Sequence, residues 1–328
     1  PTEAGELCNF DLETGELTSR LKFAQPISSS PAISESGAFL FVAGHRGVMY
    51  ILSRRPLECV QVFDSGHAPG VIEAPLLTMG PYLLAIENNQ ADNCRVRLYD
   101  VTEAERGLKE VASYQDNAGR MGHVLDSPVL RGNRLFIPSS GERVTAFTVT
   151  QETGQKPLTY VDSAQNESPI GCPIYLAVGP DDQMWMAARD LRKFHVTLDQ
   201  MEEDVKQRMR VGLSTQPLQT SGNSIFVAWR FPTSQAVFFR GVTRQQMTGE
   251  WLVVVGAPVL ATAAPNPDDG SLVCVTSAGD LFLVTAKRLA EGCIGARPLT
   301  QLKIQYDVEA TYHAARLSDG RLAVYTTG

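Results

Sequence analysis

Short apolar runs with the alternation of β-strands recur along this chain at a nearly constant interval. Several of them close on a Val-Thr pair, as in RVRLYDVT, RVTAFTVT, VFFRGVT and DLFLVT. The pairs begin at Val101, Val149, Val196, Val242 and Val284, so the steps are 48, 47, 46 and 42 residues. Self-similarity at about 40 to 50 residues, with strand-like segments in each unit, predicts an all-β propeller of four-stranded antiparallel blades.

A proline marks the start of each repeat. It follows a small or polar pair and precedes apolar residues at Pro31, Pro75, Pro128, Pro173, Pro217 and Pro258. A turn rich in Gly, Asp or Asn and then a β-branched or aromatic run come next, which is typical of consecutive antiparallel strands. Proline is tolerated at the start of a first strand because its missing N–H costs least there. Each unit is therefore predicted to contain a proline-led strand, a second strand, a third strand ending in Val-Thr, and an outer strand.

The two ends of the chain supply a seventh unit. The C-terminal TYHAARLSDGRLAVYTTG matches the first two strands of a blade, with Ala314 at the proline position, and the N-terminal GELCNFDLETGELTSRLKF matches the last two. Joining these halves would remove two open sheet edges. We therefore predict one seven-bladed β-propeller domain over residues 1–328, closed by its N-terminal strands. Its blades are expected at approximately 26–63, 70–115, 122–162, 167–211, 212–255, 256–304, and 308–328 plus 1–23.

One segment departs from the β pattern. After Val196-Thr197, the stretch LDQMEEDVKQRMRV places apolar residues at Leu198, Met201, Val205 and Met209, in steps of three and four. This spacing predicts a short amphipathic helix between the third and fourth strands of the fourth blade. RQQM and AKRLAEG, further along the chain, predict single helical turns at equivalent places. We expect these segments to cover the blade edge, the alternative being a docking surface.

The N-terminal segment NFDLETGELTSRLKF resembles the x-x-D-x-x-T-G-x-x outer repeat of the quinoprotein-like propellers, and VTQETGQKPLTY is a second, weaker match. That superfamily includes alcohol dehydrogenases using pyrroloquinoline quinone and an outer-membrane assembly lipoprotein. The resemblance implies the propeller fold and favours an extracytoplasmic location. The family's tryptophan four residues after the glycine is Ser19 here, and no two cysteines adjoin, unlike in the quinone enzymes. We therefore do not expect pyrroloquinoline quinone as a cofactor.

Composition narrows the classes of partner. The net charge is −7 and no basic stripe occurs, which argues against nucleic acid or an anionic membrane as the main partner. No apolar run approaches the length of about 18 residues that spans a membrane, so no membrane insertion is predicted. The six cysteines form no C-x-x-C pair, which disfavours a structural zinc site. We expect a monomeric domain that, beginning PTEAGEL in mid-blade, belongs to a longer polypeptide.

Candidate binding residues come from the loops that lead into each first strand, called the lead-in loops below. The residue two before each marker proline, with its aligned equivalent in the last unit, forms a predicted ring: Ser29, Glu73, Asp126, Gly171, Thr215, Gly256 and Tyr312. The histidines in or near these loops and turns are His45, His67, His123 and His313. The arginines expected in the second-to-third-strand turns of the same face are Arg46, Arg143, Arg189 and Arg230.

Two carboxylates and two imidazoles on neighbouring loops could bind a divalent cation, or could hold a base with a raised pKa. If a metal binds, calcium held by Glu73 and Asp126 is the candidate. The alternative, which we favour, is that Glu73 and Asp126 hydrogen-bond neighbouring loops while His67 and His123 are solvated. The arginines could orient a polar ligand or a peptide.

Recognisable catalytic motifs are missing from the sequence, which has no G-x-S-x-G, H-E-x-x-H or Walker loop. We therefore predict no catalytic residues and no cofactor, although the question of enzymatic activity stays open. The favoured function is a non-catalytic scaffold that binds a protein or peptide partner, as a sensor or assembly domain of a larger protein. The alternative is a metal-dependent enzyme or ligand-binding propeller with its site at the channel mouth.

Overall fold

The computed structural model describes most of the chain as antiparallel β-sheet. Its description leaves out residues 1–4, 12, 28, 45–46, 66–70, 90–92, 116–120, 153, 167–171, 181, 267, 285–297, 305, 308–309, 318 and 328. The chain divides into two compact units, and each is described by itself. Unit 1 comprises Pro1–Gly171 and Leu198–Gln200, and unit 2 comprises Cys172–Thr197 and Met201–Gly328.

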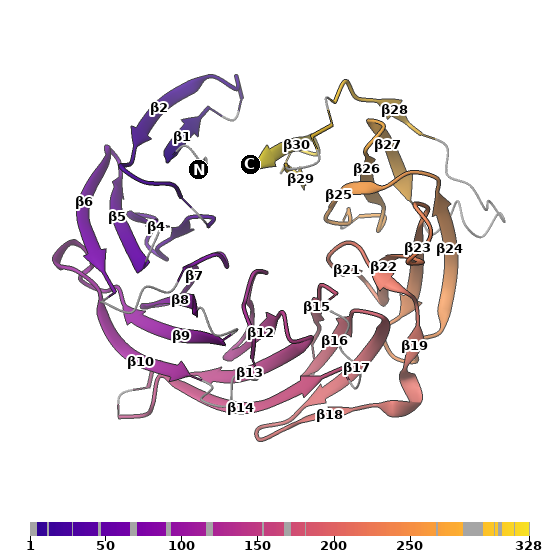
Figure 1. Ribbon diagram of the computed structural model, residues 1–328, viewed down its shortest axis with the longest axis horizontal. Helices are drawn as coiled ribbons and strands as arrows, with labels where there is room; N and C mark the ends of the chain where they lie inside the picture. The colour runs from indigo at the N-terminus through magenta and orange to yellow at the C-terminus, as the bar shows by residue number, and fades with distance from the viewer. Residues whose placement is uncertain are drawn as a thin grey trace. The chain divides into compact units, whose positions relative to one another are not determined.

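Unit 1 contains sheets whose strands pair in chain order (Figure 1). The N-terminal pair is β1 (Glu6–Phe10) and β2 (Leu17–Lys22). The first four-stranded sheet is β3 (Ala32–Ile33), β4 (Phe39–Ala43), β5 (Val48–Arg54) and β6 (Leu57–Asp64). The second is β7 (Leu77–Met79), β8 (Tyr82–Asn89), β9 (Asn93–Asp100) and β10 (Lys109–Gln115), with the 3₁₀ turn η2 (Ala104–Arg106) before β10. The third is β11 (Val129–Arg131), β12 (Arg134–Ser139), β13 (Arg143–Val149) and β14 (Leu158–Gln165).

Unit 2 repeats this plan with small additions. One sheet contains β15 (Tyr175–Val178), β16 (Gln183–Ala187), β17 (Asp190–Val196), β18 (Met201–Glu203) and β19 (Met209–Arg210). The next contains β20 (Leu213–Ser214), β21 (Gln219–Ser221), β22 (Ser224–Arg230), β23 (Val237–Thr243) and β24 (Gly249–Val255). The third contains β25 (Val259–Ala263), β26 (Leu272–Thr276), β27 (Asp280–Val284) and β28 (Thr300–Gln301). The C-terminal pair is β29 (Thr311–Arg316) and β30 (Leu322–Thr327).

The repeat predicted from the sequence is confirmed strand by strand. Each of the six marker prolines lies one or two residues before the first strand that it was expected to lead, as Pro31 precedes β3 and Pro258 precedes β25. The third strands end at the Val-Thr pairs, as β13 does at Val149. The two-stranded sheets at the chain ends correspond to the predicted half-blades. Their union into a seventh blade, and the closure of a ring, stay predictions.

The amphipathic helix predicted after Val196-Thr197 is wrong. Met201–Glu203 instead pairs with β17 as β18, and the 3₁₀ turn η3 (Val205–Gln207) leads to β19. Leu198 and Val205 are 81% and 71% exposed, so the apolar residues at helical spacing do not share a buried face. Strand pairing on the open edge of β17 outweighs the weak local preference for a helix.

The two predicted single turns have different outcomes. RQQM forms one turn, in which Met247 N donates to Thr243 O at 3.0 Å. AKRLAEG lies outside the described residues.

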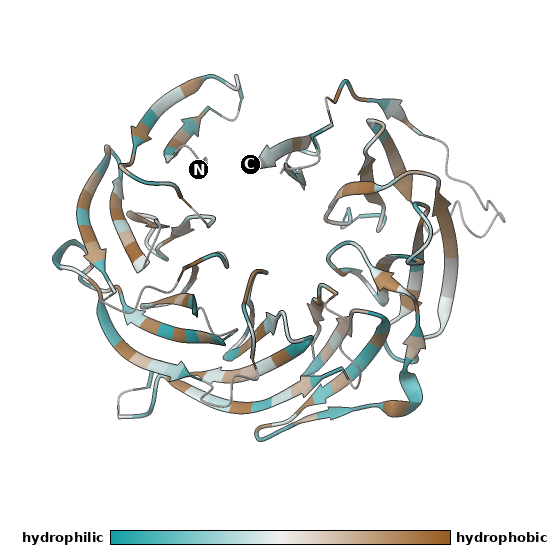
Figure 2. Cartoon of the chain, viewed as in Figure 1, coloured by the Kyte–Doolittle hydropathy of each residue, from teal (hydrophilic) through white to brown (hydrophobic). Residues whose placement is uncertain are grey.

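The core lies between successive sheets of each unit, because the inner strands are buried on both faces. Along β8, Leu83 and Ala85 pack with residues of the β3–β6 sheet, while Leu84 and Ile86 pack with residues of the β11–β14 sheet. Alternate side chains of a strand point to opposite faces, so one apolar run supplies two interfaces. The outer strands β6 and β14 instead contain hydrophilic as well as hydrophobic residues (Figure 2). No helix in the described part of the chain is long and apolar enough to cross a membrane.

Candidate functional site

A buried amide joins the lead-in loops of two successive sheets in unit 1. Asn88, at the end of β8, is 5% exposed. Its Nδ2 donates to Glu73 Oε2 at 2.6 Å and to Val124 O at 2.9 Å, and its Oδ1 accepts from Val124 N at 2.8 Å. Its backbone exchanges two hydrogen bonds with Val71. We call this arrangement of Glu73, Asn88, His123 and Val124 the Asn88 junction; it uses both donors and the acceptor of the amide.

His123 is part of the same junction and is half-buried. Its Nε2 lies 2.7 Å from Asn89 O, and because a carbonyl can only accept, Nε2 carries the proton in this contact. The backbone N of His123 donates to Ser140 Oγ at 2.9 Å, and Ser140 N donates to His123 O at 2.7 Å. The ring is therefore held by protein contacts on one side.

The predicted carboxylates lie in the expected lead-in loops, and both residues are exposed. Glu73 accepts a hydrogen bond from Asn88. Although Asp126 is exposed as a whole, nearby protein atoms displace part of the water around its carboxyl group and so raise the pKa of that group. Among the residues that the structure describes, no group of three or more His, Cys, Asp or Glu side chains could hold a metal ion. His67 lies outside the described residues. The calcium site of Glu73 and Asp126 therefore stays a prediction.

Sequence analysis did not identify Glu142, which is fully buried in the turn between β12 and β13. Its φ is 49°, a conformation uncommon for residues other than glycine. Asn166 Nδ2 donates to Glu142 Oε2 at 2.5 Å, and Asn166 N donates to Glu142 O at 3.0 Å. The next residue, Arg143, donates to Ser163 Oγ at 2.6 Å and to Gln165 Oε1 at 2.8 Å. Arg143, predicted as a residue of the binding face, thus holds the outer strand of its own sheet.

A second junction, in unit 2, is built from backbone. Gly212 N donates to Arg189 O at 3.0 Å, and Ser214 N donates to Ala188 O at 2.8 Å. On the other side, Leu213 pairs with Arg230 in the β20–β22 ladder. The segment 211–214 therefore runs between the turn after β16 and the end of β22. We call this segment, together with Arg189 and residues 229–231, the Gly212 junction.

Glycine is required at the centre of this junction. Gly212 has a φ of +110°, a backbone conformation that residues with a Cβ rarely adopt. A Cβ there would lie 2.8 Å from Trp229 Cε3 and 2.9 Å from Arg230 O. The backbone thus approaches β22 more closely than any other residue would allow.

An aromatic cluster lies beside Gly212. Trp229, 8% exposed, stacks on Phe238 with ring centroids 4.5 Å apart and planes at 13°. Phe231 meets both rings edge-on, at 5.0 Å from Trp229 and 5.4 Å from Phe238, and is 50% exposed. Sequence analysis did not single out Phe231. Its exposure is set by the turn after β22 and has no signature in the periodic pattern.

Two of the predicted arginines belong to the backbone of this junction, Arg189 through its O, which accepts from Gly212 N, and Arg230 through its pairing with Leu213. Arg189 is exposed and Arg230 is half-buried. Neither guanidinium group forms a hydrogen bond or an ion pair with any residue in the described part of the chain, whereas Arg143 forms two hydrogen bonds. The residues of the Gly212 junction thus include two arginines without an ion pair to any described residue, and one exposed aromatic ring.

The remaining predicted site residues lie on other elements or outside the described part of the chain. Thr215, half-buried, follows β20, and its N donates to Ala228 O at 3.0 Å. Tyr312 is buried within β29 rather than in a loop, and its hydroxyl accepts from Asp307 N at 2.7 Å. His313 stacks on Tyr325 at 5.1 Å, and burial lowers its pKa. The structural description does not cover His45 and Arg46.

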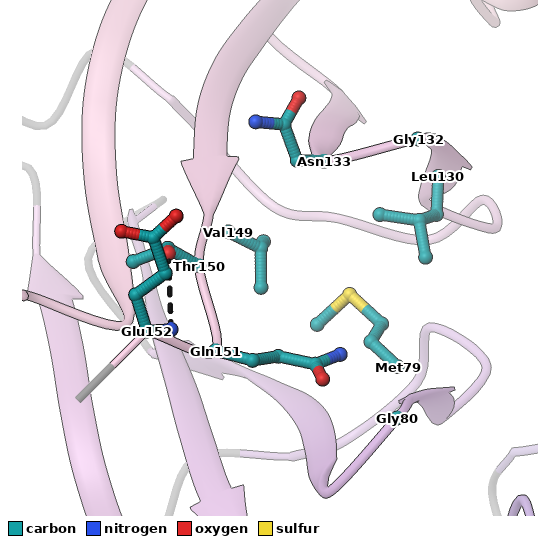
Figure 3. A pocket seen from close by; sticks show the side chains of 9 residues that line it. All are labelled: Met79, Gly80, Leu130, Gly132, Asn133, Val149, Thr150, Gln151 and Glu152. Carbon is teal, nitrogen blue, oxygen red and sulfur yellow. Dashed lines mark hydrogen bonds between the residues drawn. The ribbon is translucent and has the colours of Figure 1, made fainter.

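A pocket of about 470 Å³ lies in unit 1, at the ends of the strands opposite to the Asn88 junction (Figure 3). Its walls are Met79, Gly80, Leu130, Gly132, Asn133, Val149, Thr150, Gln151 and Glu152. Glu152 N donates to Thr150 Oγ1 at 3.2 Å (Figure 3). Glu152 is the one titratable side chain in this wall, so the pocket offers no pair of groups for acid–base chemistry.

Comparison with known proteins identifies the fold. No protein-family model matches the sequence, and no curated protein matches it. BamB from Moraxella catarrhalis is similar in structure, with a TM-score of 0.67 and 12% identity, over 99% of this chain and 87% of that one. The C-terminal WD40 domain of Sif2 gives a TM-score of 0.66 with 13% identity, over 99% and 88% of the two chains.

Chaetomium thermophilum Sqt1, solved bound to the N-terminus of the ribosomal protein L10, is also similar. It gives a TM-score of 0.56 with 18% identity, over 77% of this chain and 69% of that one. The chain therefore has the β-propeller fold of quinoprotein-like and WD40-like proteins, and the resemblance drawn from its repeats is confirmed.

Proposed function

We propose that this chain is a non-catalytic β-propeller scaffold that binds a protein or peptide partner. The observation that carries the proposal is the exposed ring of Phe231, seated on the buried Trp229 and on Phe238. Exposing half of a large aromatic side chain forgoes part of the free energy that its burial would contribute to folding. Aromatic residues are enriched at protein interfaces, where a few such anchors contribute most of the binding energy.

The rigid support of Phe231 strengthens this proposal. Trp229 is fixed from below by Gly212 and from the side by Phe238, so the ring that it carries is ordered before a partner arrives. Pre-ordering lowers the entropy lost on binding. The Sqt1 structure, with its bound N-terminal segment, supports the idea that a propeller of this kind can hold a short stretch of another chain.

Selection from a random displayed peptide library, with the 328-residue chain as bait, tests the proposal. Peptides that survive selection are synthesised, and their dissociation constants are measured by fluorescence anisotropy against the folded and the heat-unfolded chain. We expect saturable binding to the folded chain alone. Sedimentation of the free chain and of the complex checks the predicted monomer and gives the stoichiometry. Absence of any saturable binder would refute the proposed function.

A further inference from the structure

We infer that the pocket of about 470 Å³ in unit 1, called the Gln151 pocket below, binds a peptide segment through one aliphatic side chain and the peptide groups beside it. The inference rests on the proposed function only in that the ligand is a polypeptide, and its site lies in a different unit from Phe231. It depends on an apolar floor and on two side-chain amides that line the same pocket (Figure 3).

The apolar floor of the Gln151 pocket is made by Met79, Leu130 and Val149. Met79 and Val149 are only 4% and 6% exposed and belong to the core between the β7–β10 and β11–β14 sheets, against which Leu130 packs. The floor is therefore a small aliphatic surface held in place by the core. None of the nine described residues in the wall is aromatic, so the pocket lacks the flat ring on which a nucleobase would stack.

The two amides belong to Asn133 and Gln151, which are both exposed. Neither side chain forms a hydrogen bond with any residue in the part of the chain that the structure describes. Figure 3 shows Gln151 reaching across the pocket toward Gly80, and a Cβ at Gly80 would overlap Gln151 Nε2. The Gln151 amide is therefore supported by backbone on one side while its hydrogen-bonding groups stay available.

The charges around the Gln151 pocket favour a neutral ligand. Glu152 is the one charged residue among the nine described residues of the wall, and its Oε2 accepts from Gln155 Nε2. The described wall includes no arginine or lysine, so a phosphate or carboxylate ligand would find no cation there.

A second pocket of unit 1 makes the contrast clear. Its volume is about 560 Å³, and Asp100, Thr102, Glu103 and Arg106 are among the residues that line it. These polar side chains bond one another: Thr102 Oγ1 donates to Asp100 Oδ1 at 2.7 Å, and Arg106 pairs with Glu103 at 3.1 Å. The Gln151 pocket is the smaller of the two, but its amides are not consumed by internal hydrogen bonds.

These features together define the chemistry of the ligand. Asn and Gln side chains each carry donors and an acceptor, which match the N–H and the C=O of a peptide group. A side chain of Leu, Ile, Val or Met would cover the apolar floor, and its burial would supply most of the affinity. The volume lies within the range of about 300 to 1,000 Å³ that is usual for ligand pockets. One aliphatic residue with its two flanking peptide groups therefore satisfies both parts of the wall.

The test observes the pocket directly, through the methyl group of Met79. The chain has eight methionines, so labelling their methyl groups with carbon-13 gives a simple NMR spectrum, in which Met79→Leu identifies the Met79 signal. The probe is the capped tripeptide acetyl-Gly-Leu-Gly-amide, and acetyl-Gly-Lys-Gly-amide and N-acetylglucosamine are the comparison ligands. We expect the leucine peptide alone to shift the Met79 signal saturably, with a dissociation constant on the order of a millimolar.

Two double variants isolate the contribution of the amides. Asn133→Ala/Gln151→Ala removes both of them and should weaken binding of the leucine peptide by about tenfold. Asn9→Ala/Gln115→Ala is the matched control, because both residues are exposed, lie outside the pocket wall and form no side-chain hydrogen bond with any described residue. This control should change the affinity by less than about twofold. Thermal unfolding confirms that each variant is folded.

The outcomes separate this inference from the proposed function. An unmoved Met79 signal, an equal shift with N-acetylglucosamine, or an affinity that Asn133→Ala/Gln151→Ala leaves unchanged would overturn the inference. If the library yields binders but the leucine peptide does not shift the Met79 signal, the scaffold function stands and the inference fails. If the leucine peptide shifts that signal but the library yields no binder, the pocket stands as a site and the proposed function fails.

Discussion

At the Asn88 junction a buried side-chain amide joins two successive sheets, whereas at the Gly212 junction the backbone makes the same connection. Asn88 bonds both the N and the O of Val124 in the following lead-in loop. Gly212 and Ser214 donate their own N–H groups to the turn after β16. Both junctions therefore connect successive sheets through hydrogen bonds. One of them uses a side-chain amide and the other uses backbone groups.

The difference decides which side chains remain available. At the Asn88 junction, Glu73 and His123 are both used to hold the loops. At the Gly212 junction, backbone groups make the connection, so the side chains of Arg189 and Phe231 are not needed for it. Polar residues in lead-in loops are thus weak indicators of a site until their internal partners are known.

Each junction has a cluster of three charged residues in its sheet, and the two clusters have opposite arrangements of charge. In the β7–β10 sheet one cation, Arg97, lies between two carboxylates, Glu87 at 3.1 Å and Glu110 at 3.0 Å. In the β15–β19 sheet one carboxylate, Glu203, lies between two cations, Arg192 and Arg208. Burial raises the pKa of Glu87, whereas the hydrogen bond from Arg192 lowers the pKa of Glu203.

The largest effect is expected from removing the shared cation of the first cluster. Arg97→Met leaves the carboxylate of Glu87, itself 2% exposed, buried without its partner. We expect the free energy of unfolding to fall by about 3 to 5 kcal/mol in urea titrations. The double variant Arg97→Met/Glu87→Gln should recover much of the loss. If it is as unstable as the single variant, packing rather than charge makes Arg97 important.

Asn88→Ala should have the next largest effect. It removes three hydrogen bonds and leaves the backbone N and O of Val124, a fully buried residue, without their amide partner. The expected loss is about 2 to 4 kcal/mol in the free energy of unfolding. Asn89→Ala is the matched control, because His123 bonds the backbone O of Asn89 and this contact survives. Equal losses in the two variants would show that the amide does not join the sheets.

Gly212→Ala should be less severe. The new Cβ would crowd Trp229 and Arg230 O at a φ of +110°, and we expect a loss of about 1 to 3 kcal/mol. Gly222→Ala separates the causes, since Gly222 has a φ of +53° with nothing within 4 Å of its Cβ position. If the two variants lose the same stability, backbone conformation and not the close approach explains the glycine. The same Gly212→Ala variant should also lose affinity for selected peptides.

The smallest effect concerns pH and has opposite signs in the two clusters. The pKa of Glu87 is raised above 4.5, so its contribution to stability is complete below that value and is lost as pH rises through the raised pKa. The pKa of Glu203 is lowered, so its contribution is complete above 4.5 and is lost as pH falls through the lowered pKa. Unfolding free energies of Glu87→Gln and Glu203→Gln, each compared with the parent from about pH 3 to 7, should diverge in opposite directions. Parallel curves would contradict the contrast between the clusters.

The repeat could be predicted from the sequence because it depends on the local conformational preferences of a few residues. Proline before a first strand and Val-Thr at the end of a third strand are constraints that act within a few residues. Their agreement with β3, β13 and β25 shows how much of a propeller such markers define. The helix predicted after Thr197 failed for the converse reason: its periodicity was local, while the pairing of Met201 with Val196 on the edge of β17 was decided by the sheet.

The candidate site could be predicted from the sequence only in part. The sequence identified Arg189 and Arg230 by their positions in the repeat, but it gave Arg143 the same rank. Only the structure shows that Arg143 bonds Ser163 and Gln165. It also shows the exposed Phe231 and the buried Glu142, neither of which interrupts the repeat pattern.

The sequence by itself determined the all-β class, the strand order within each repeat and the turns that separate the strands, because proline, glycine and apolar alternation restrict the backbone residue by residue. Only the tertiary structure decided which polar groups are consumed by internal hydrogen bonds and which remain for a partner. That distinction depends on contacts between residues far apart in the chain, such as Asn88 with Val124 and Gly212 with Arg189. No local pattern encodes such contacts.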